Sequence, residues 1–410
     1  MSPSSRGDPD PATNEVIKRQ YDPFSLEVLA DPYPWYAWLR ETTAAYHVPE
    51  TDIWVITRAA DVEPTLRNHT VFSSTGGVGP EWVQRPMMSM YDPPEHTRLR
   101  RMVSGYFTPK FVEQFRPQAE ATAMKLVDAF LEKPEGDFVA DVAEPLVATL
   151  IADLLGIPNE RRADFRRWSQ ATVLALATGL TPDETAQSEA TRVEFVKYLK
   201  EVAAARRAEV SSSSVKTTDL ISLLVAAGGQ ETLKPSEVTA FCVLLLVAGF
   251  ETTVNGLANI MYVFMTRPEV WSAIQGDRSL LRGAVEEALR IESPVQAFFR
   301  NTLKETTVDS VVIPERSKVM VAFGSANRDP ARYDDPESYR LDRKPSDHLS
   351  FGAGVHHCIG APLARMQYEV VLQHMLGRVR TITPAGEGAT RTLNVLMRGF
   401  RRLPLVMHAG

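Results

Sequence analysis

One thiol at the end of a glycine-rich stretch, Phe351–Gly360 (FGAGVHHCIG), constrains this chain more than any other feature. Gly352 and Gly354 can adopt a positive φ angle, which lets the backbone pass close to a flat ligand. The Gly-Ala-Pro at 360–362 opens a helix, because proline suits the first helical turn. The free amides and the positive dipole end of that helix favour a thiolate over a thiol at Cys358.

Two interpretations of this cysteine follow from the residues alone. An anionic sulfur in a tight, dry turn is the axial ligand that a haem iron takes. The alternative is a structural cysteine, because free cysteine is among the most buried residue types. The spacing around the thiol decides between them.

That spacing resembles the haem-binding signature of the cytochrome P-450 superfamily: Phe, two residues, Gly, one residue, Arg or His, one residue, Cys, one residue, Gly. Phe351, Gly354, His356, Cys358 and Gly360 fill the fixed positions. The resemblance implies haem b with a Cys358 thiolate as axial ligand and O2 as co-substrate. It also implies that Phe351, Gly352 and Gly360 surround the cofactor.

Composition sets broader limits on the chain. The 410 residues are 44% apolar, and no Gly/Ser or charged linker divides them, so we expect one domain over residues 21–410. Residues 1–20 are polar and proline-rich, and we expect them to be disordered. The net charge of -6 argues against nucleic-acid binding. Two cysteines, Cys242 and Cys358, argue against a disulfide framework and for a cytoplasmic location.

We also expect no membrane anchor, because the longest apolar run, residues 241–250, is too short to span a bilayer. Helical periodicity predicts helices over Phe111–Glu132, Val142–Leu155, Glu189–Val210, Ser236–Thr266, Leu280–Ile291 and Pro362–Val379. Alternation predicts a hairpin from residues 45–48 and 53–56, and short strands near Val311, near Val319 and at the C-terminus. The chain is therefore mainly α with a small β portion. The resemblance implies the cytochrome P-450 fold, with haem between the long oxygen-activation helix and the cysteine-loop helix.

The expected helix over Ser236–Thr266 contains Ala248-Gly-Phe-Glu-Thr-Thr253. Glycine in mid-helix costs about 1 kcal/mol relative to alanine, and a threonine hydroxyl can bond the i−4 carbonyl, so we expect a kink there. An acid beside an alcohol can relay protons. The motif resembles the family's oxygen-activation sequence, which implies that Ala248 borders the cofactor, Thr252 bonds the iron-bound oxygen and Glu251 supplies protons. The alternative is a core helix with an incidental glycine.

Charged residues elsewhere match further family positions. Glu287 and Arg290 lie at i and i+3, where pairs are usually solvated, but they match the family's Glu-x-x-Arg. With Arg343, the resemblance implies a buried cluster that supports folding and the haem loop. It also implies four ligands of the haem propionates, although each could singly be a solvated surface residue: His96, Arg100, Arg300 and His356.

The resemblance implies a substrate pocket built from four separate segments. Their side chains are apolar, which suits a small apolar or aromatic substrate, although each could be ordinary core. They are Val78, Trp82, Met87, Met88, Leu244, Val247, Ala248, Val295, Phe298, Leu396 and Met397.

A closer resemblance rests on residues 22–26, 292–300 and 324–330, which look like those of bacterial members that oxidise small aromatic acids. Those members hold the substrate carboxylate with polar residues of the loop before the His96 helix. Arg85, Gln84 and Ser73 or Ser74 could do so here. Camphor-like terpenoids and secondary-metabolite scaffolds remain alternatives.

No flavin-binding glycine loop and no four-cysteine iron–sulfur set accompanies the haem motif. We therefore expect electrons from a ferredoxin and its reductase, docked on a basic patch, in an otherwise monomeric enzyme. That patch comprises Arg98, Arg101, Lys110 and Arg365. The sequence thus predicts a haem-thiolate monooxygenase that hydroxylates or O-dealkylates a small substrate. The alternatives are a natural-product tailoring enzyme that couples, desaturates or nitrates, and a non-catalytic haem sensor or carrier.

Overall fold

The computed structural model describes residues 20–174, 181–211, 219–226, 232–343 and 347–410. The disorder expected for residues 1–20 falls almost wholly outside them. Helices form most of the described chain, as predicted.

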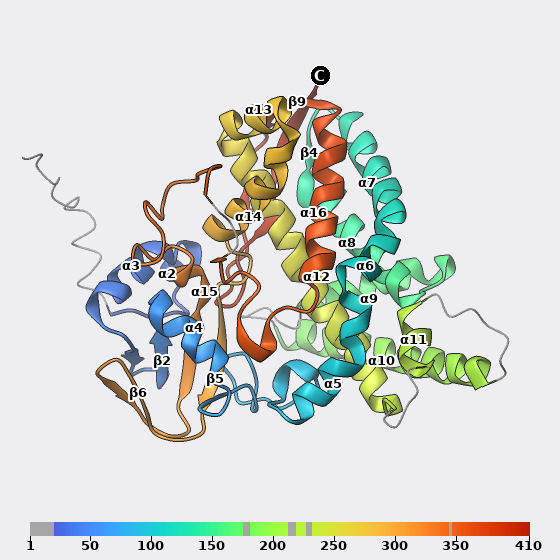
Figure 1. Cartoon of the computed structure of the whole chain (residues 1–410). Helices are drawn as coiled ribbons and strands as arrows, with labels where there is room; N and C mark the ends of the chain where they lie inside the picture. Colours follow the sequence, from blue (N-terminus) through green and yellow to red (C-terminus); the bar gives the residue numbers. More distant parts are fainter. Residues whose placement is uncertain (1–19, 175–180, 212–218, 227–231, 344–346) are drawn as a thin grey trace, which may run out of the picture.

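Helix α12 (Pro235–Thr266) is the central element of the helical part. Its residues are apolar on nearly all sides, which is typical of a helix that packs on every face. It contacts α8 (Glu144–Leu155), α9 (Arg162–Leu174), α10 (Pro182–Ser211), α11 (Leu220–Ala226), α14 (Leu281–Ile291) and α16 (Ala361–Leu376). Figure 1 shows α16, which follows the cysteine loop, crossing in front of α12 and alongside α7 (Arg116–Leu131).

Among the described residues, α12 is also the one helix long and apolar enough to cross a membrane. More than half of its apolar window, 56%, is buried inside the protein. The core helix of a soluble protein passes the same test of length and composition. The expected absence of a membrane anchor stays a prediction.

The largest sheet lies beside the helices, at the blue and orange end of Figure 1. It has the order β1-β2-β8-β5-β3 and is mixed, because β2 pairs with β8 in parallel. Its strands are β1 (Tyr46–Val48), β2 (Ile53–Ile56), β8 (Lys318–Ala322), β5 (Ala297–Thr302) and β3 (Phe72–Ser73). The predicted hairpin is confirmed as β1 and β2, and the strand near Val319 as β8.

Smaller sheets and short helices complete the fold. Two further sheets are hairpins, β6 (Thr306–Val308) with β7 (Val311–Ile313) and β10 (Thr390–Arg391) with β11 (Phe400–Arg402). A third has the order β4-β12-β9, from β4 (Gly136–Asp137), β12 (Pro404–Ala409) and β9 (Val379–Pro384). The remaining α-helices of the described residues are α2 (Leu26–Ala30), α3 (Tyr33–Thr42), α4 (Ala59–Arg67), α5 (Glu95–Ser104), α6 (Pro109–Val112), α13 (Pro268–Gly276) and α15 (Phe323–Ala326).

Several predicted helix bounds were wrong, and a proline explains the division of one predicted helix. The helix expected over Phe111–Glu132 is divided into α6, a 3-10 turn over Glu113–Phe115, and α7, whose first turn holds a proline. Proline lacks the N–H that a continuous helix needs, so a new helix begins there. The helix expected from Glu189 begins earlier, at Pro182, because its polar first turns lack an apolar stripe. The helices expected over Ser236–Thr266, Leu280–Ile291 and Pro362–Val379 are confirmed within a few residues.

Candidate active site

The cysteine loop closes on itself through one backbone hydrogen bond, from the Cys358 N–H to the Phe351 carbonyl at 2.8 Å. Gly352 and Gly354 have φ angles of 70° and 69°, as predicted. At Gly354 a Cβ atom would lie 2.7 Å from the Leu66 carbonyl oxygen, so only glycine lets the loop pack on the end of α4. The loop therefore holds Cys358 at the start of α16.

The thiol of Cys358 is subject to opposing influences. Burial is the largest and raises its pKa, whereas hydrogen bonds from the Gly360 and Ala361 N–H groups and the charges of Arg100 and Arg365 lower it. The side chain nevertheless has accessible surface. These two observations agree if the sulfur faces an open space inside the fold. A metal cation in that space would stabilise the thiolate further, because a coordinating thiol loses its proton.

The four predicted propionate ligands lie together near this loop. The rings of His96 and His356 are 4.3 Å apart, and Nδ1 of His96 and Nε2 of His356 are buried without a partner among the described residues. Burial and then the Arg100 charge lower the pKa of His96 to about 4. Burial and then the Arg300 charge, with smaller effects of neighbouring charges, lower the pKa of His356 to about 2. Unpaired buried donors beside arginines fit an anionic ligand such as a haem propionate.

The two arginines of this group differ in their contacts. Arg300 is buried, and burial lowers its pKa to about 10; one of its Nη atoms donates to the Phe299 carbonyl at 2.8 Å. Arg100 donates to the carbonyls of Val355 at 3.1 Å and His357 at 2.7 Å. Arg100 thus braces the cysteine loop in addition to the role that the sequence predicts.

Glu251 and Thr252 lie next to each other on α12 but in different environments. Glu251 is buried, its Oε2 has no partner among the described residues, and burial raises its pKa to about 7. The Thr252 hydroxyl donates to the Ala248 carbonyl at 2.7 Å, the i−4 bond that the sequence predicts. The helix is continuous through this point, so the expected kink stays a prediction. A carboxyl with a pKa near neutrality can both give and take a proton.

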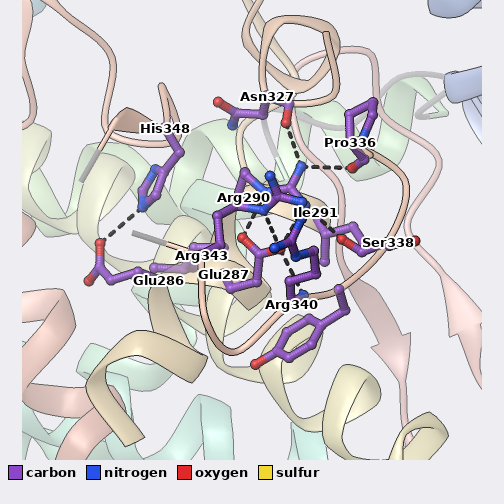
Figure 2. Close-up of polar contacts among 12 residues, drawn as sticks. Glu286, Glu287, Arg290, Ile291, Asn327, Pro336, Ser338, Arg340, Arg343 and His348 are labelled. Atoms are coloured by element: carbon purple, nitrogen blue, oxygen red, sulfur yellow. Dashed lines mark hydrogen bonds and ion pairs between the residues drawn. The ribbon is translucent and has the colours of Figure 1, made fainter. Parts of the chain in front are cut away.

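The predicted Glu–Arg–Arg cluster is present and buried (Figure 2). Arg290 forms two hydrogen bonds with Glu287, both at 2.7 Å, and Arg343 Nε donates to the same carboxylate at 3.1 Å. Arg290 also donates to the carbonyls of Asn327 and Pro336, both at 2.8 Å. The planar guanidinium thus serves a carboxylate and backbone carbonyls together.

Sequence reasoning missed the residues that connect this cluster to the cysteine loop. The Asn327 Oδ1 atom accepts from the Leu349 N–H at 2.6 Å, and its Nδ2 donates to the Ser350 hydroxyl at 2.9 Å, directly before Phe351. Beside them, Glu286 pairs with His348 at 2.9 Å. Asn327 lies in a segment that the sequence analysis used for resemblance alone, and no periodicity marks its role.

The predicted pocket residues fall into three groups, apart from Ala248, which is exposed on α12. Four pack on the largest hydrophobic cluster, around α12: Met87, Met88, Leu244 and Val247. Four belong to the cluster beside the main sheet, where Val295 and Met397 form an isolated β-bridge: Val295, Phe298, Leu396 and Met397. Val78 and Trp82 lie on the loop after β3; the Val78 carbonyl accepts from the Phe299 N–H at 2.9 Å, and Trp82 is 57% exposed.

Of the polar residues predicted to hold a carboxylate, two are engaged internally. The Gln84 side chain accepts from the Gly76 N–H at 2.7 Å and donates to the Met90 carbonyl at 3.0 Å. Ser73 bonds Asp92, whereas the buried Ser74 hydroxyl has no partner among the described residues, and Arg85 is exposed.

The four residues of the predicted docking patch differ in their surroundings. Arg98 pairs with Glu95 and Glu237, and Arg365 pairs with Glu286 at 2.6 Å. Arg101 and Lys110 are exposed.

Comparison with known proteins agrees with this geometry. The family model described as Cytochrome P450 matches residues 46–399. The chain belongs to the cytochrome P450 family. It is therefore a haem-thiolate monooxygenase, as the sequence predicts, and the cofactor of the family is haem b held by a cysteine thiolate, with O2 as co-substrate.

Three relatives illustrate the range of similarity. The chain is 36% identical over 397 residues to "Cytochrome P450 monooxygenase PikC" of Streptomyces venezuelae, covering 93% of this chain and 92% of that protein. It is 33% identical to "Cytochrome p450 CYP199A2" of Rhodopseudomonas palustris, covering 94% and 93%. The solved structure of CYP109Q5 from Chondromyces apiculatus matches with a TM-score of 0.86 at 35% identity, covering 95% and 98%.

Proposed function

We propose that this cytochrome P450 hydroxylates or O-dealkylates a small apolar or aromatic substrate, with Cys358 as the iron ligand. When bound, haem supplies the activation of O2, and a thiolate ligand favours O–O cleavage. The observation that carries the proposal is the buried Glu251 carboxyl beside Thr252 on α12, whose Oε2 has no partner among the described residues, because O2 activation needs a proton source. A carrier or sensor of haem has no use for a titrating acid there.

The chain's own residues have separate tasks in this proposal. Cys358 holds the cofactor, with its thiolate stabilised by the Gly360 and Ala361 amides. His96 and His356 would bind its carboxylates through the ring nitrogens that have no partner among the described residues, and the buried Arg300 would add a positive charge beside them. Together they would hold the carboxylates of the cofactor near the cysteine loop.

Proton delivery falls to Glu251 and Thr252. With its pKa near 7, Glu251 can give up a proton and be recharged from solvent within the physiological range. The Thr252 hydroxyl, which bonds the Ala248 carbonyl at rest, can rotate to donate into the site.

The matched test exploits two threonines of α12 that make the same helix bond. Thr252 donates to Ala248 O and Thr266 to Tyr262 O, at 2.7 and 2.8 Å. In Thr252→Ala we expect reductant to be consumed without matching product, whereas Thr266→Ala should behave as the wild type. Equal coupling in Thr252→Ala and the wild type would contradict the proposed role.

The apolar lining supports the proposed substrate class. The test is a titration of the ferric protein, because a substrate that displaces water from the iron shifts the haem from low to high spin. We expect small aromatic acids, phenols or monoterpenoids to shift the ferric haem from low to high spin. A shift with benzoate-type acids that is lost in Ser74→Ala would support carboxylate binding, since the Ser74 hydroxyl is buried and unpartnered among the described residues. No shift across the panel would instead favour a larger, natural-product scaffold.

Electrons come from a separate protein in this proposal. A cytoplasmic ferredoxin with its reductase is the expected donor, docking near the exposed Arg101 and Lys110 on the cysteine side. The enzyme is proposed to be a monomer with one domain. The rate of haem reduction should fall steeply with salt if such charges steer docking.

A further inference from the structure

Lys318, at the start of β8, is a lysine held inside the protein. It is 4% exposed, although lysine is almost never fully buried unless paired. The hydrogen-bond partners of its ammonium among the residues that the structure describes are backbone carbonyls, and no carboxylate is among them. A buried charge without a partner is costly, so its retention calls for another compensating interaction.

That compensation comes from the loop after β3. The Lys318 Nζ atom lies 3.1 Å from the Glu81 carbonyl oxygen, 3.3 Å from that of Gly77 and 3.5 Å from that of Gly76. It also lies 4.9 Å from the centroid of the Trp82 ring. An ammonium has three donors and no acceptor, and an aromatic face attracts a cation, so the lysine matches this enclosure in both respects.

The loop is shaped to receive the ammonium. Its two ends are joined by a bond from the Val83 N–H to the Gly76 carbonyl at 2.9 Å. Gly77 has a φ angle of 106°, and a Cβ atom there would lie 2.7 Å from the Val83 carbonyl, so only glycine permits the turn. The segment Gly76–Val83 thus forms a closed loop with its carbonyls directed inward at Lys318.

The same segment carries Val78 and Trp82, two predicted substrate contacts. Trp82 is 57% exposed, and its ring lies beside the Lys318 ammonium. The Val78 carbonyl is bonded to Phe299, next to the buried Arg300. Whatever holds this segment therefore sets one wall of the substrate pocket.

We propose that Lys318 positions the substrate-bordering segment Gly76–Val83, as an internal cation enclosed by its carbonyls and the Trp82 ring. The inference rests on the proposed function in that the segment borders the pocket. Burial, followed by the charge of Arg300 on the neighbouring strand, lowers the pKa of Lys318 to about 8. Below that pH the ammonium holds the segment; as pH rises through it, the neutral amine loses one donor and its attraction to the ring.

The first test is hydrogen–deuterium exchange of the holoenzyme and its Lys318→Met variant. We expect the amides of residues 76–83 to exchange faster in the variant, on the order of tenfold, with the other strands unchanged. Lys304→Met, which removes an exposed lysine from the turn after β5, is the matched control. Equal exchange in Lys318→Met and the wild type would overturn the proposal. Exchange does not depend on catalysis, so failure of the proposed function would leave this result interpretable.

The second test uses two iron ligands of different size, imidazole and 4-phenylimidazole, titrated by absorption. Lys318→Met should weaken the binding of 4-phenylimidazole several-fold and leave the binding of imidazole unchanged, because the larger ligand would extend into the pocket that the segment is proposed to border. In the wild type, the ratio of the two dissociation constants should change as pH passes about 8. In the Lys318→Met variant, the same ratio should not depend on pH. A ratio that is independent of pH in the wild type would contradict the proposal.

If Lys318→Met does not fold, the variant Trp82→Leu tests the proposed enclosure of Lys318 instead. It removes the exposed ring while leaving the three carbonyls around the ammonium. We expect it to loosen the segment and to shift the pH dependence of the ratio, since the ring face no longer favours the charged form. Exchange and pH dependence identical to those of the wild type would refute the role of the ring and, with it, the proposed enclosure.

Discussion

Glu251→Gln should change how the stability of the protein depends on pH. The carboxyl is buried, and burial raises its pKa from 4.5 to about 7. A raised pKa means that the folded protein binds the proton more tightly than the unfolded chain. Stability from this group is therefore fully present below the unfolded pKa, and it declines until the folded pKa has been passed. Glutamine keeps the shape of the protonated acid but cannot ionise.

The magnitude follows from the two pKa values. Their difference, multiplied by 1.36 kcal/mol per pKa unit, is about 3 kcal/mol of unfolding free energy lost by the wild type above neutrality. Glu251→Gln lacks this loss. The two proteins should thus be similarly stable near pH 4, below the unfolded pKa of 4.5, and the variant should be more stable by about 3 kcal/mol near pH 9.

Urea denaturation at both pH values measures this difference. Glu269→Gln, an exposed residue on α13, is the matched control and should follow the wild type at both. The reasoning is refuted if Glu251→Gln and the wild type lose stability in parallel between the two pH values. In that case the carboxyl would ionise freely in the folded protein.

Two further substitutions probe the support of the cysteine loop. Arg290→Lys should lower the free energy of unfolding in urea by about 3–5 kcal/mol. One ammonium cannot replace the two hydrogen bonds to Glu287, so a buried carboxylate would be left underpaired. The control Arg340→Lys, whose side chain pairs with Asp342 at the surface, should have no measurable effect. Gly354→Ala should lower haem retention and reduce the free energy of unfolding by at least about 1–2 kcal/mol, because the φ angle is 69° and the new Cβ atom would collide with Leu66. The control Gly276→Ala, whose Cβ atom would meet no neighbour, should retain haem normally. Retention in Gly354→Ala equal to that of the wild type would mean that the loop need not pack on α4.

How far the sequence predicts this molecule depends on the range of the interaction. Gly352, Gly354 and the start of α16 follow from local rules, since positive φ and a proline in the first helical turn are encoded within a few residues. The pairing of Glu287 with Arg290 is likewise local, at i and i+3. Arg343 joins them from 56 residues away, and only the family resemblance could place it.

What the sequence left unpredicted is long-range and irregular. Asn327 links Arg290 to residues 349 and 350 through loop backbone that has no period to read. Lys318 starts the strand that was expected near Val319, but nothing in the strand pattern indicates that its ammonium contacts carbonyls more than 230 residues earlier in the chain. Arg98 was expected on a docking surface, but it forms an ion pair with Glu237, which lies on another helix. Such contacts appear only once the fold brings the segments together.

The absorption spectrum of the ferrous carbon monoxide complex tests the central claim most directly, namely that the Cys358 thiolate holds the haem iron. The account predicts the strongly red-shifted Soret band of a thiolate-ligated complex in the wild type and in Cys242→Ser, whose buried thiol has its pKa raised to about 12. It predicts loss of that band in Cys358→Ser. A red-shifted band that survives in Cys358→Ser, or an imidazole-type band in the wild type, would contradict the account.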